Sequence, residues 1–229
     1  MKPLALFSVL LLIISLPTQA EWYTQPKIGF EYTDYELTIG SSLPATASVP
    51  TVTLGVSLIS DLGFYLDFEY GSGNAFEVEG LYSSGGELDR ATINASMGVA
   101  TDSGWVIFYG LNSSGSDFIS DSPSIEPTLT FESIGFVFGL AKSVKFSPAH
   151  SLSFSAALAL LSGTYSENLT GSIDNEAEGF ANGFSWSASY AYRTLSSSTL
   201  SIGVKSQSYT YTEMEDVDSF QSYPDVTED

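Results

Sequence analysis

Apolar and polar residues alternate with a period of two along most of this chain. In TVTLGVSLI, residues 51–59, every second residue is apolar, and FYLDFEY, residues 64–70, repeats the pattern with phenylalanine, leucine and tyrosine on one face. Successive side chains of a β-strand point to opposite faces, so this period predicts strands that each have one apolar face. The pattern predicts nine strands, over residues 27–37, 51–59, 64–70, 91–99, 105–111, 128–141, 152–160, 184–192 and 199–211.

The predicted strand over residues 128–141 changes phase part of the way along. Phe131 is out of step with the apolar series that starts at Ile134. The change predicts either a β-bulge or a strand that rises beyond a membrane.

Two architectures bury one face of each such strand. A soluble sandwich packs its apolar faces inward against a second sheet, whereas a membrane barrel turns them outward to lipid. The faces opposite the apolar stripes are small and weakly polar, which suits the inside of a barrel; they include Ser153, Ser155, Ala157, Gly183, Ser185 and Ser187. Charged residues make up 15% of the chain, against about 25% in typical soluble domains. We therefore predict an all-β, antiparallel, up-and-down transmembrane β-barrel.

Aromatic residues gather near several predicted strand ends. Such residues form girdles at the two interfaces of a membrane barrel, and ordinary core packing is the other explanation for them. The predicted girdle residues are Trp22, Tyr23, Trp105, Tyr192, Tyr209 and Tyr211.

The first 20 residues have the features of a secretory signal peptide. Lys2 precedes an apolar run from Leu4 to Leu16, and the small residue Ala20 stands at the expected cleavage site. The run is shorter than the roughly 20 apolar residues that a membrane-spanning helix needs, although an uncleaved anchor helix is the alternative. We expect residues 1–20 to be removed and residues 21–229 to form the barrel domain.

Short and long connections alternate between the predicted strands. The short turns are 60–63, 101–104, 147–150 and 193–198, and the long links are 40–50, 71–87, 112–127 and 162–178. With the signal peptide and the absence of cysteine, this alternation resembles the bacterial outer-membrane β-barrels, which have short periplasmic turns and long extracellular loops. The resemblance is architectural, and it implies a location in the bacterial outer membrane, in contact with its lipids and lipopolysaccharide.

The C-terminal residues predict that a strand is missing. Nine strands that start at the periplasmic side deliver the chain to the outside near Tyr211, and the acidic segment that follows contains Pro224 and no strand long enough to return. Bacterial barrels usually have an even number of strands. We expect a chain truncated in its last extracellular loop and a complete barrel of ten or more strands, with a natural nine-stranded barrel as the alternative.

Charged residues on the predicted inner faces are the candidate functional residues. We expect Arg90 to lie close to Asp67 and Glu69 if the hairpin is in simple register. Such groups line a route for solutes or only neutralise one another, because charges inside a narrow barrel need partners. The lumen-lining candidates are Lys27, Glu31, Asp67, Glu69, Arg90 and Lys205.

The predicted long loops are strongly acidic. The net charge of −20 argues against nucleic acid as a partner, because a polyanion needs cationic contacts. An acidic rim suits divalent cations shared with lipopolysaccharide, or a cationic partner, although a solvated loop surface is the default. The spacing predicts no specific metal site and no cofactor; the loop carboxylates include Glu77, Glu79, Asp117, Asp121, Glu126, Glu167, Asp174, Glu176, Glu178 and those of 213–218.

No catalytic constellation stands out. His150 is the only histidine, and it falls in a predicted periplasmic turn, whereas outer-membrane enzymes of this architecture use histidine near the outer rim. Serine needs such a base for nucleophilic chemistry. We predict a non-enzymatic, porin-like barrel for passive passage of small solutes or ions; the alternative is a structural or surface-interaction barrel with acidic loops and no open channel.

Overall fold

The computed structural model describes residues 20–40, 45–80, 86–120, 127–169, 173–194, 198–216, 222 and 224–229. The predicted signal peptide, apart from Ala20, lies outside these residues. The eleven secondary-structure elements of these described residues are all strands of one sheet. They are β1 (Trp22–Ile39), β2 (Ala45–Ser60), β3 (Phe64–Ala75), β4 (Val78–Glu79), β5 (Gly86–Ala100), β6 (Trp105–Ser120), β7 (Pro127–Lys145), β8 (His150–Leu169), β9 (Ile173–Arg193), β10 (Thr199–Asp216) and β11 (Val226–Glu228).

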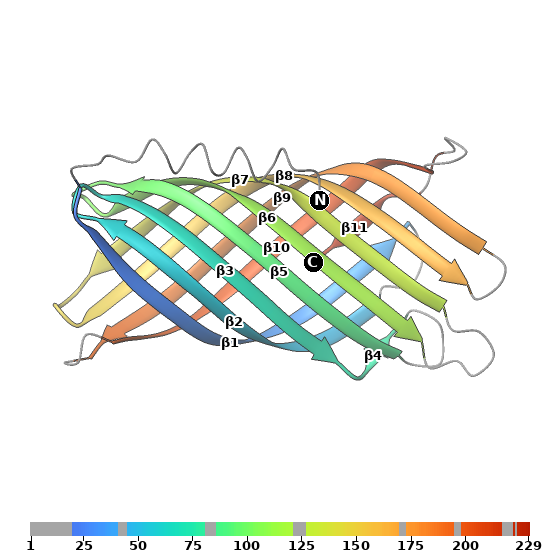
Figure 1. Ribbon diagram of the computed structural model, residues 1–229, viewed down its shortest axis with the longest axis horizontal. Helices are drawn as coiled ribbons and strands as arrows, with labels where there is room; N and C mark the ends of the chain where they lie inside the picture. The colour runs from blue at the N-terminus through green and yellow to red at the C-terminus, as the bar shows by residue number, and fades with distance from the viewer. Residues whose placement is uncertain are drawn as a thin grey trace.

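The sheet closes on itself as an antiparallel barrel. Each long strand pairs with its neighbour in the chain, β11 pairs with both β10 and β1, and β1 also pairs with β2. The two-residue β4 is a short addition to β2, so ten strands form the closed ring (Figure 1). The predicted fold class is confirmed. The tenth strand of the ring is the three-residue β11, which lies in the C-terminal segment where no returning strand was predicted.

The nine predicted strands all occur, but most are longer than predicted. The short turns are confirmed at 61–63, 101–104, 146–149 and 194–198, and we call this end of the barrel the turn end. The opposite, rim end is different from the prediction, because most of each predicted long link is strand. The connections that remain there are 40–44, 76–85, 121–126, 170–172 and 217–225, with β4 inside the second.

The predicted long links are mostly strand in the structure because the apolar face of each strand changes sides along its length. In the half of the barrel nearer the turn end, the large apolar side chains point outward, with Ile28 81%, Leu158 64% and Ile202 75% exposed. Nearer the rim end they point inward and are buried. β7 shows both arrangements. Phe131, in its rim half, points inward and is fully buried, whereas Ile134, nearer the turn end, points outward and is 51% exposed.

No β-bulge causes this change in β7. The register of β7 with β6 and with β8 runs without interruption from Thr128 to Leu140. Phe131 and Ile134 therefore differ in direction simply because they have opposite parity, and the inner face itself becomes apolar toward the rim. The bulge alternative is wrong.

The barrel is sealed by β11 only near the rim end. β11 pairs with Leu37–Ile39 of β1 and with Tyr209–Tyr211 of β10, and Asp229 adds a backbone pair with Glu36. Nearer the turn end, residues 22–35 of β1 and 199–208 of β10 each have one strand neighbour among the described residues.

Candidate functional site

A buried layer of large side chains fills the rim half of the barrel interior. Phe131 of β7 and Tyr211 of β10 are both 0% exposed, and their rings meet edge to face with centroids 4.8 Å apart. We call this layer the plug. Its other large members are Tyr35, Leu37, Leu88, Phe118, Leu129, Leu161, Tyr165, Tyr209, Met214 and Val226.

An ion pair crosses the interior within the plug. Nη1 of Arg90 on β5 lies 2.7 Å from Oε1 of Glu228 on β11, and the same nitrogen donates to Oγ of Ser116 at 2.8 Å. The Tyr211 hydroxyl donates to the other carboxylate oxygen of Glu228 at 3.3 Å. The Arg90 guanidinium also lies over the Tyr35 ring, 4.3 Å from its centroid. Both charges are buried and hydrogen-bonded, which is the condition for keeping an ion pair out of water.

The predicted grouping of Arg90 with Asp67 and Glu69 is wrong. In the register of β3 with β5, Arg90 stands opposite Gly73, whereas Asp67 stands opposite Ser96 and Glu69 opposite Asn94. β3 does not end at Tyr70, as predicted, but continues to Ala75. Arg90 therefore pairs with a residue of β3 that lies beyond Tyr70, nearer the rim.

The other predicted lumen charges lie in the more open, turn half of the interior. Lys27 on β1 reaches Asp67 on β3, with 2.5 Å between Nζ and Oδ1, and Ser57 donates to the same oxygen at 2.5 Å. Glu31 shares the inward parity of Lys27 but is exposed, and Glu69 is half-buried. This pairing of Lys27 with Asp67 fits the structural interpretation, in which the lumen charges neutralise one another.

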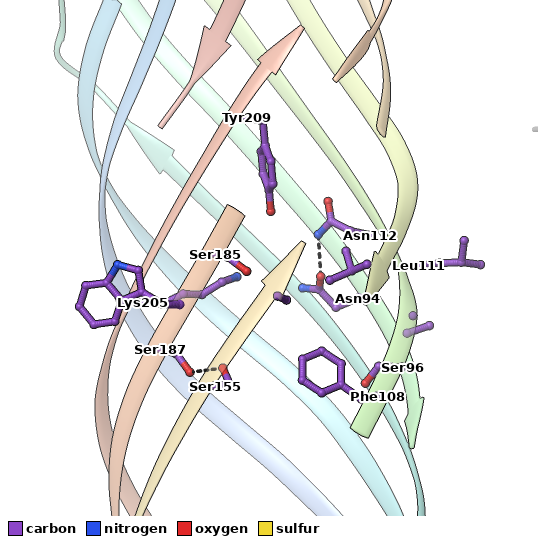
Figure 2. A pocket seen from close by; sticks show the side chains of 15 residues that line it. Asn94, Ser96, Phe108, Leu111, Asn112, Ser155, Ser185, Ser187, Lys205 and Tyr209 are labelled. Carbon is purple, nitrogen blue, oxygen red and sulfur yellow. Dashed lines mark hydrogen bonds between the residues drawn. The ribbon is translucent and has the colours of Figure 1, made fainter. Parts of the chain in front are cut away.

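A small cavity with both polar and apolar walls lies below the plug, and we call it the Lys205 chamber. Its volume is about 190 Å³, and it is lined by Lys205, Asn94, Asn112, Ser155, Ser187 and Tyr209, among others. Figure 2 shows Lys205 with Ser155, Ser185 and Ser187 on one wall and Asn94 and Asn112 on the other. Tyr209, which belongs to the plug, lies at the end of the chamber. Asn112 donates to the Asn94 side-chain oxygen at 2.6 Å, and the Ser155 and Ser187 hydroxyls are 2.7 Å apart.

An acidic groove of about 830 Å³ lies along β1, β2 and β3 at the rim end. Carboxylates and two exposed aromatic rings line it, including Asp34, Glu36, Glu77, Glu79, Asp229, Tyr32 and Phe76. Among the described residues, no three carboxylates or histidines converge closely enough to hold a metal ion. Asp121, Glu126 and Asp218 lie outside those residues.

His150 begins β8 at the turn end. Its Nδ1 lies 2.5 Å from the Tyr190 hydroxyl, and its ring stacks with Tyr190 and packs against Tyr192. These contacts give the imidazole aromatic and hydroxyl neighbours on the outer surface.

Two predicted girdle residues belong to the plug instead. Tyr209 and Tyr211 are 4% and 0% exposed because they have the inward parity of Lys205 on β10. Trp105, Tyr23 and Tyr192, in contrast, are exposed near the turn end. Core packing therefore explains the two tyrosines.

Glu228 is the site residue that the sequence did not reveal. It lies in a short acidic segment without apolar alternation, so nothing near it indicates a buried position. A weaker signal did exist for the plug: Ala45, Ala47 and Val49 alternate with polar residues in the opposite phase to Val52 and Leu54.

Among the residues that the structure describes, no helix is long and apolar enough to cross a bilayer. Comparison with family models, with characterised proteins and with solved structures gives no match to this chain.

Proposed function

We propose that this protein is a bacterial outer-membrane β-barrel whose interior is closed by the plug, and which acts through its rim surface rather than as an open pore. The plug is the observation that carries this proposal. Its central side chains, Phe131, Tyr211, Leu37 and Leu129, are at most 1% exposed, so little water reaches the centre of that layer.

The outer surface supports the membrane location. Large apolar side chains that point away from the interior are exposed on every long strand, and a contiguous exposed apolar surface of this kind marks contact with lipid or a partner. Examples are Phe30 at 74%, Leu54 at 51%, Phe68 at 48%, Phe136 at 55%, Leu158 at 64%, Phe184 at 50% and Ile202 at 75%. Outward residues nearer the rim are mostly polar, for example Asp34, Glu132 and Glu178.

The rim is the surface that this proposal assigns to partners. The acidic groove combines carboxylates with the exposed rings of Tyr32 and Phe76. Carboxylates at this position suit divalent cations shared with lipopolysaccharide, or a cationic partner. We propose no catalytic role for His150, because its contacts are the rings of Tyr190 and Tyr192 at the opposite end of the barrel.

Porin-like passage of small solutes or ions is the second candidate, and the Lys205 chamber favours it. The chamber has a lysine, two asparagines and several serines in its wall, and it lies in the more open, turn half of the interior. Passage through the barrel requires the plug to move, because the chamber ends at Tyr209 on the rim side (Figure 2).

Conductance in planar lipid bilayers separates the two candidates. We expect the purified protein to insert without stepwise conductance. Sustained channels would reject the closed barrel in favour of porin-like passage.

A separate measurement must show that the protein has inserted, because the absence of conductance is informative only for inserted protein. Trp186 points outward on β9 and is 44% exposed. In a variant that keeps this tryptophan and replaces the other two by phenylalanine, we expect lipids brominated on their acyl chains to quench the fluorescence. Absence of quenching in folded protein would reject the membrane location.

A further inference from the structure

We propose that the Lys205 chamber binds a small oxyanion, of the phosphate or phosphate-ester class, through the Lys205 ammonium. This inference goes beyond the proposed function, and it does not depend on whether the barrel conducts. The chain carries a net charge of −20, so an anion site is unexpected and has to be built by local structure.

In the part of the chain that the structure describes, no carboxylate lines the chamber. Its wall consists of serine and asparagine side chains, small residues, a few apolar residues, Tyr209 and Lys205. The inward carboxylate next to it in the ladder, Glu69, stands opposite Asn94 on β5 and does not line the chamber. A cation in a carboxylate-free, partly enclosed cavity makes the local potential positive despite the net charge.

Lys205 forms no ion pair among the described residues. Lys142, Lys145 and Arg193 form none either, but Lys205 is the cation that lines the chamber. Lys27 is paired with Asp67, and Arg90 with Glu228. Lys142 bonds the Ser103 carbonyl and lies 5.1 Å from the Trp105 ring centroid. The Lys205 ammonium instead points into the chamber (Figure 2).

Further hydrogen-bond donors surround the same space. Because the Asn94 oxygen accepts from Asn112, the Asn94 amino group is left to donate into the chamber. Ser155 and Ser187 share one hydrogen bond, so one of these two hydroxyl protons is also left. Lys205 stands opposite Ser187 in the ladder, which brings a charge and a hydroxyl together. Charge-assisted bonds of this kind are the stronger ones in anion recognition.

The size of the chamber suits a small oxyanion. A volume of 190 Å³ is several times the roughly 30 Å³ that a water molecule occupies in the liquid. A tetrahedral oxyanion therefore fits together with some of its hydration water.

Two sources of phosphate are compatible with this position. The turn half of the interior is available to a free anion. Lys205 also lies on the stretch of β10 that has one strand neighbour among the described residues, beside the outward apolar residues Ile202 and Val204. A phospholipid headgroup would reach Lys205 from that side, while its acyl chains stayed on the apolar surface.

Equilibrium dialysis with radiolabelled orthophosphate tests the site in the detergent-solubilised protein. We expect saturable binding that weakens about ten-fold or more in Lys205→Gln and largely survives in Lys205→Arg, because the charge is what binds. Lys142→Gln is the matched control, since it removes one lysine charge at the outer surface. Glu69→Gln should tighten binding, because it removes the neighbouring negative charge.

A lipid arm distinguishes the two sources. The protein is passed through mixed micelles that contain phosphatidylglycerol or, as the neutral control, diacylglycerol, and bound lipid is counted by native mass spectrometry. Orthophosphate binding that depends on Lys205 indicates that the ligand is a free anion. Retention of phosphatidylglycerol alone, if it depends on Lys205, indicates that the ligand is a lipid headgroup. Either result supports the site. Binding of neither, or equal binding by Lys205→Gln that retains the β-sheet circular dichroism of the parent, would overturn it.

Discussion

Arg90 and Glu228, which are 138 residues apart in the chain, form the buried ion pair that ties the closing strand β11 to the opposite wall of the barrel. The side chains of the pair are 7% and 1% exposed. The pair links the plug to closure, because Glu228 is also the residue that pairs with Leu37 of β1 and Tyr209 of β10 in the sheet.

We expect Arg90→Met to destabilise the barrel by roughly 3–5 kcal/mol, because it leaves the Glu228 carboxylate buried without a counter-charge. The double variant Arg90→Met/Glu228→Leu should recover much of this loss, since it removes both charges. Urea unfolding followed by tryptophan fluorescence measures both. If the single variant is as stable as the parent, the ion pair does not hold β11.

The ion pair between Lys27 and Asp67 should contribute much less. Its side chains are 39% and 23% exposed, so water screens the charges. We expect Lys27→Met to cost about 1 kcal/mol or less, as is usual for partly exposed pairs. A loss comparable to that of Arg90→Met in the same unfolding experiment would mean that the turn half of the interior is dry.

Leu158→Arg tests whether the exposed apolar surface faces lipid. Leu158 points outward on β8 and is 64% exposed. On a lipid-facing surface near the bilayer midplane, arginine costs roughly 2–4 kcal/mol, whereas on a water-facing surface the change is nearly neutral. The free energy of unfolding from lipid vesicles measures the difference.

Thr164→Arg is the control on the same strand and the same outward face. Thr164 stands between Glu132 of β7 and Glu178 of β9 in the ladder, so arginine gains opposite charges there. It should be neutral or slightly stabilising. Equal costs at residues 158 and 164 would argue against a membrane boundary between them.

The double variant Phe131→Ala/Tyr211→Ala should open the interior. The two rings form the edge-to-face contact at the centre of the plug, and both are fully buried. In planar bilayers we expect stepwise conductance from this variant and none from the parent or from Phe136→Ala, which truncates an outward ring on the same strand as Phe131. A silent double variant that still inserts would show that other plug residues suffice to close the barrel.

Gly104 should be the residue of its turn that tolerates substitution least. It has a φ of +81°, and a Cβ there would lie 2.6 Å from the Ser143 carbonyl oxygen. We expect Gly104→Ala to cost at least about 1–2 kcal/mol, the usual cost of a left-handed conformation for a residue with a Cβ. Gly115→Ala, where a Cβ meets no atom within 4 Å, should be neutral or slightly stabilising in the same urea titration.

Much of the fold could be predicted because the outward face of each strand is locally encoded. The alternation through Leu152, Phe154, Leu158 and Leu160 predicts a strand and its exposed face without knowledge of any neighbour. The tight turns at the turn end follow from where that alternation stops. For these reasons the all-β class and the positions of the nine long strands agree with the structure.

The rim half was less predictable because its inner and outer faces exchange character. Residues such as Glu176 and Glu178 look like loop carboxylates when only the apolar outward stripe is followed. In the structure they lie on the outward face of β9, and Ala177 between them is buried in the plug. The strand continues toward the rim, but its outward face becomes polar and its inward face becomes apolar.

Local alternation along the chain specifies the β-strands, the parity of their side chains and hence the inward direction of Lys27, Asp67, Arg90 and Lys205. Which of these charges meet depends on the three-dimensional arrangement of the strands. The partner of Arg90 depends on how far β3 and β5 extend along one another and on a three-residue strand that reaches it across the barrel. Periodicity is a property of neighbouring residues, whereas contact across a closed barrel depends on register and on ring closure, which no local pattern records.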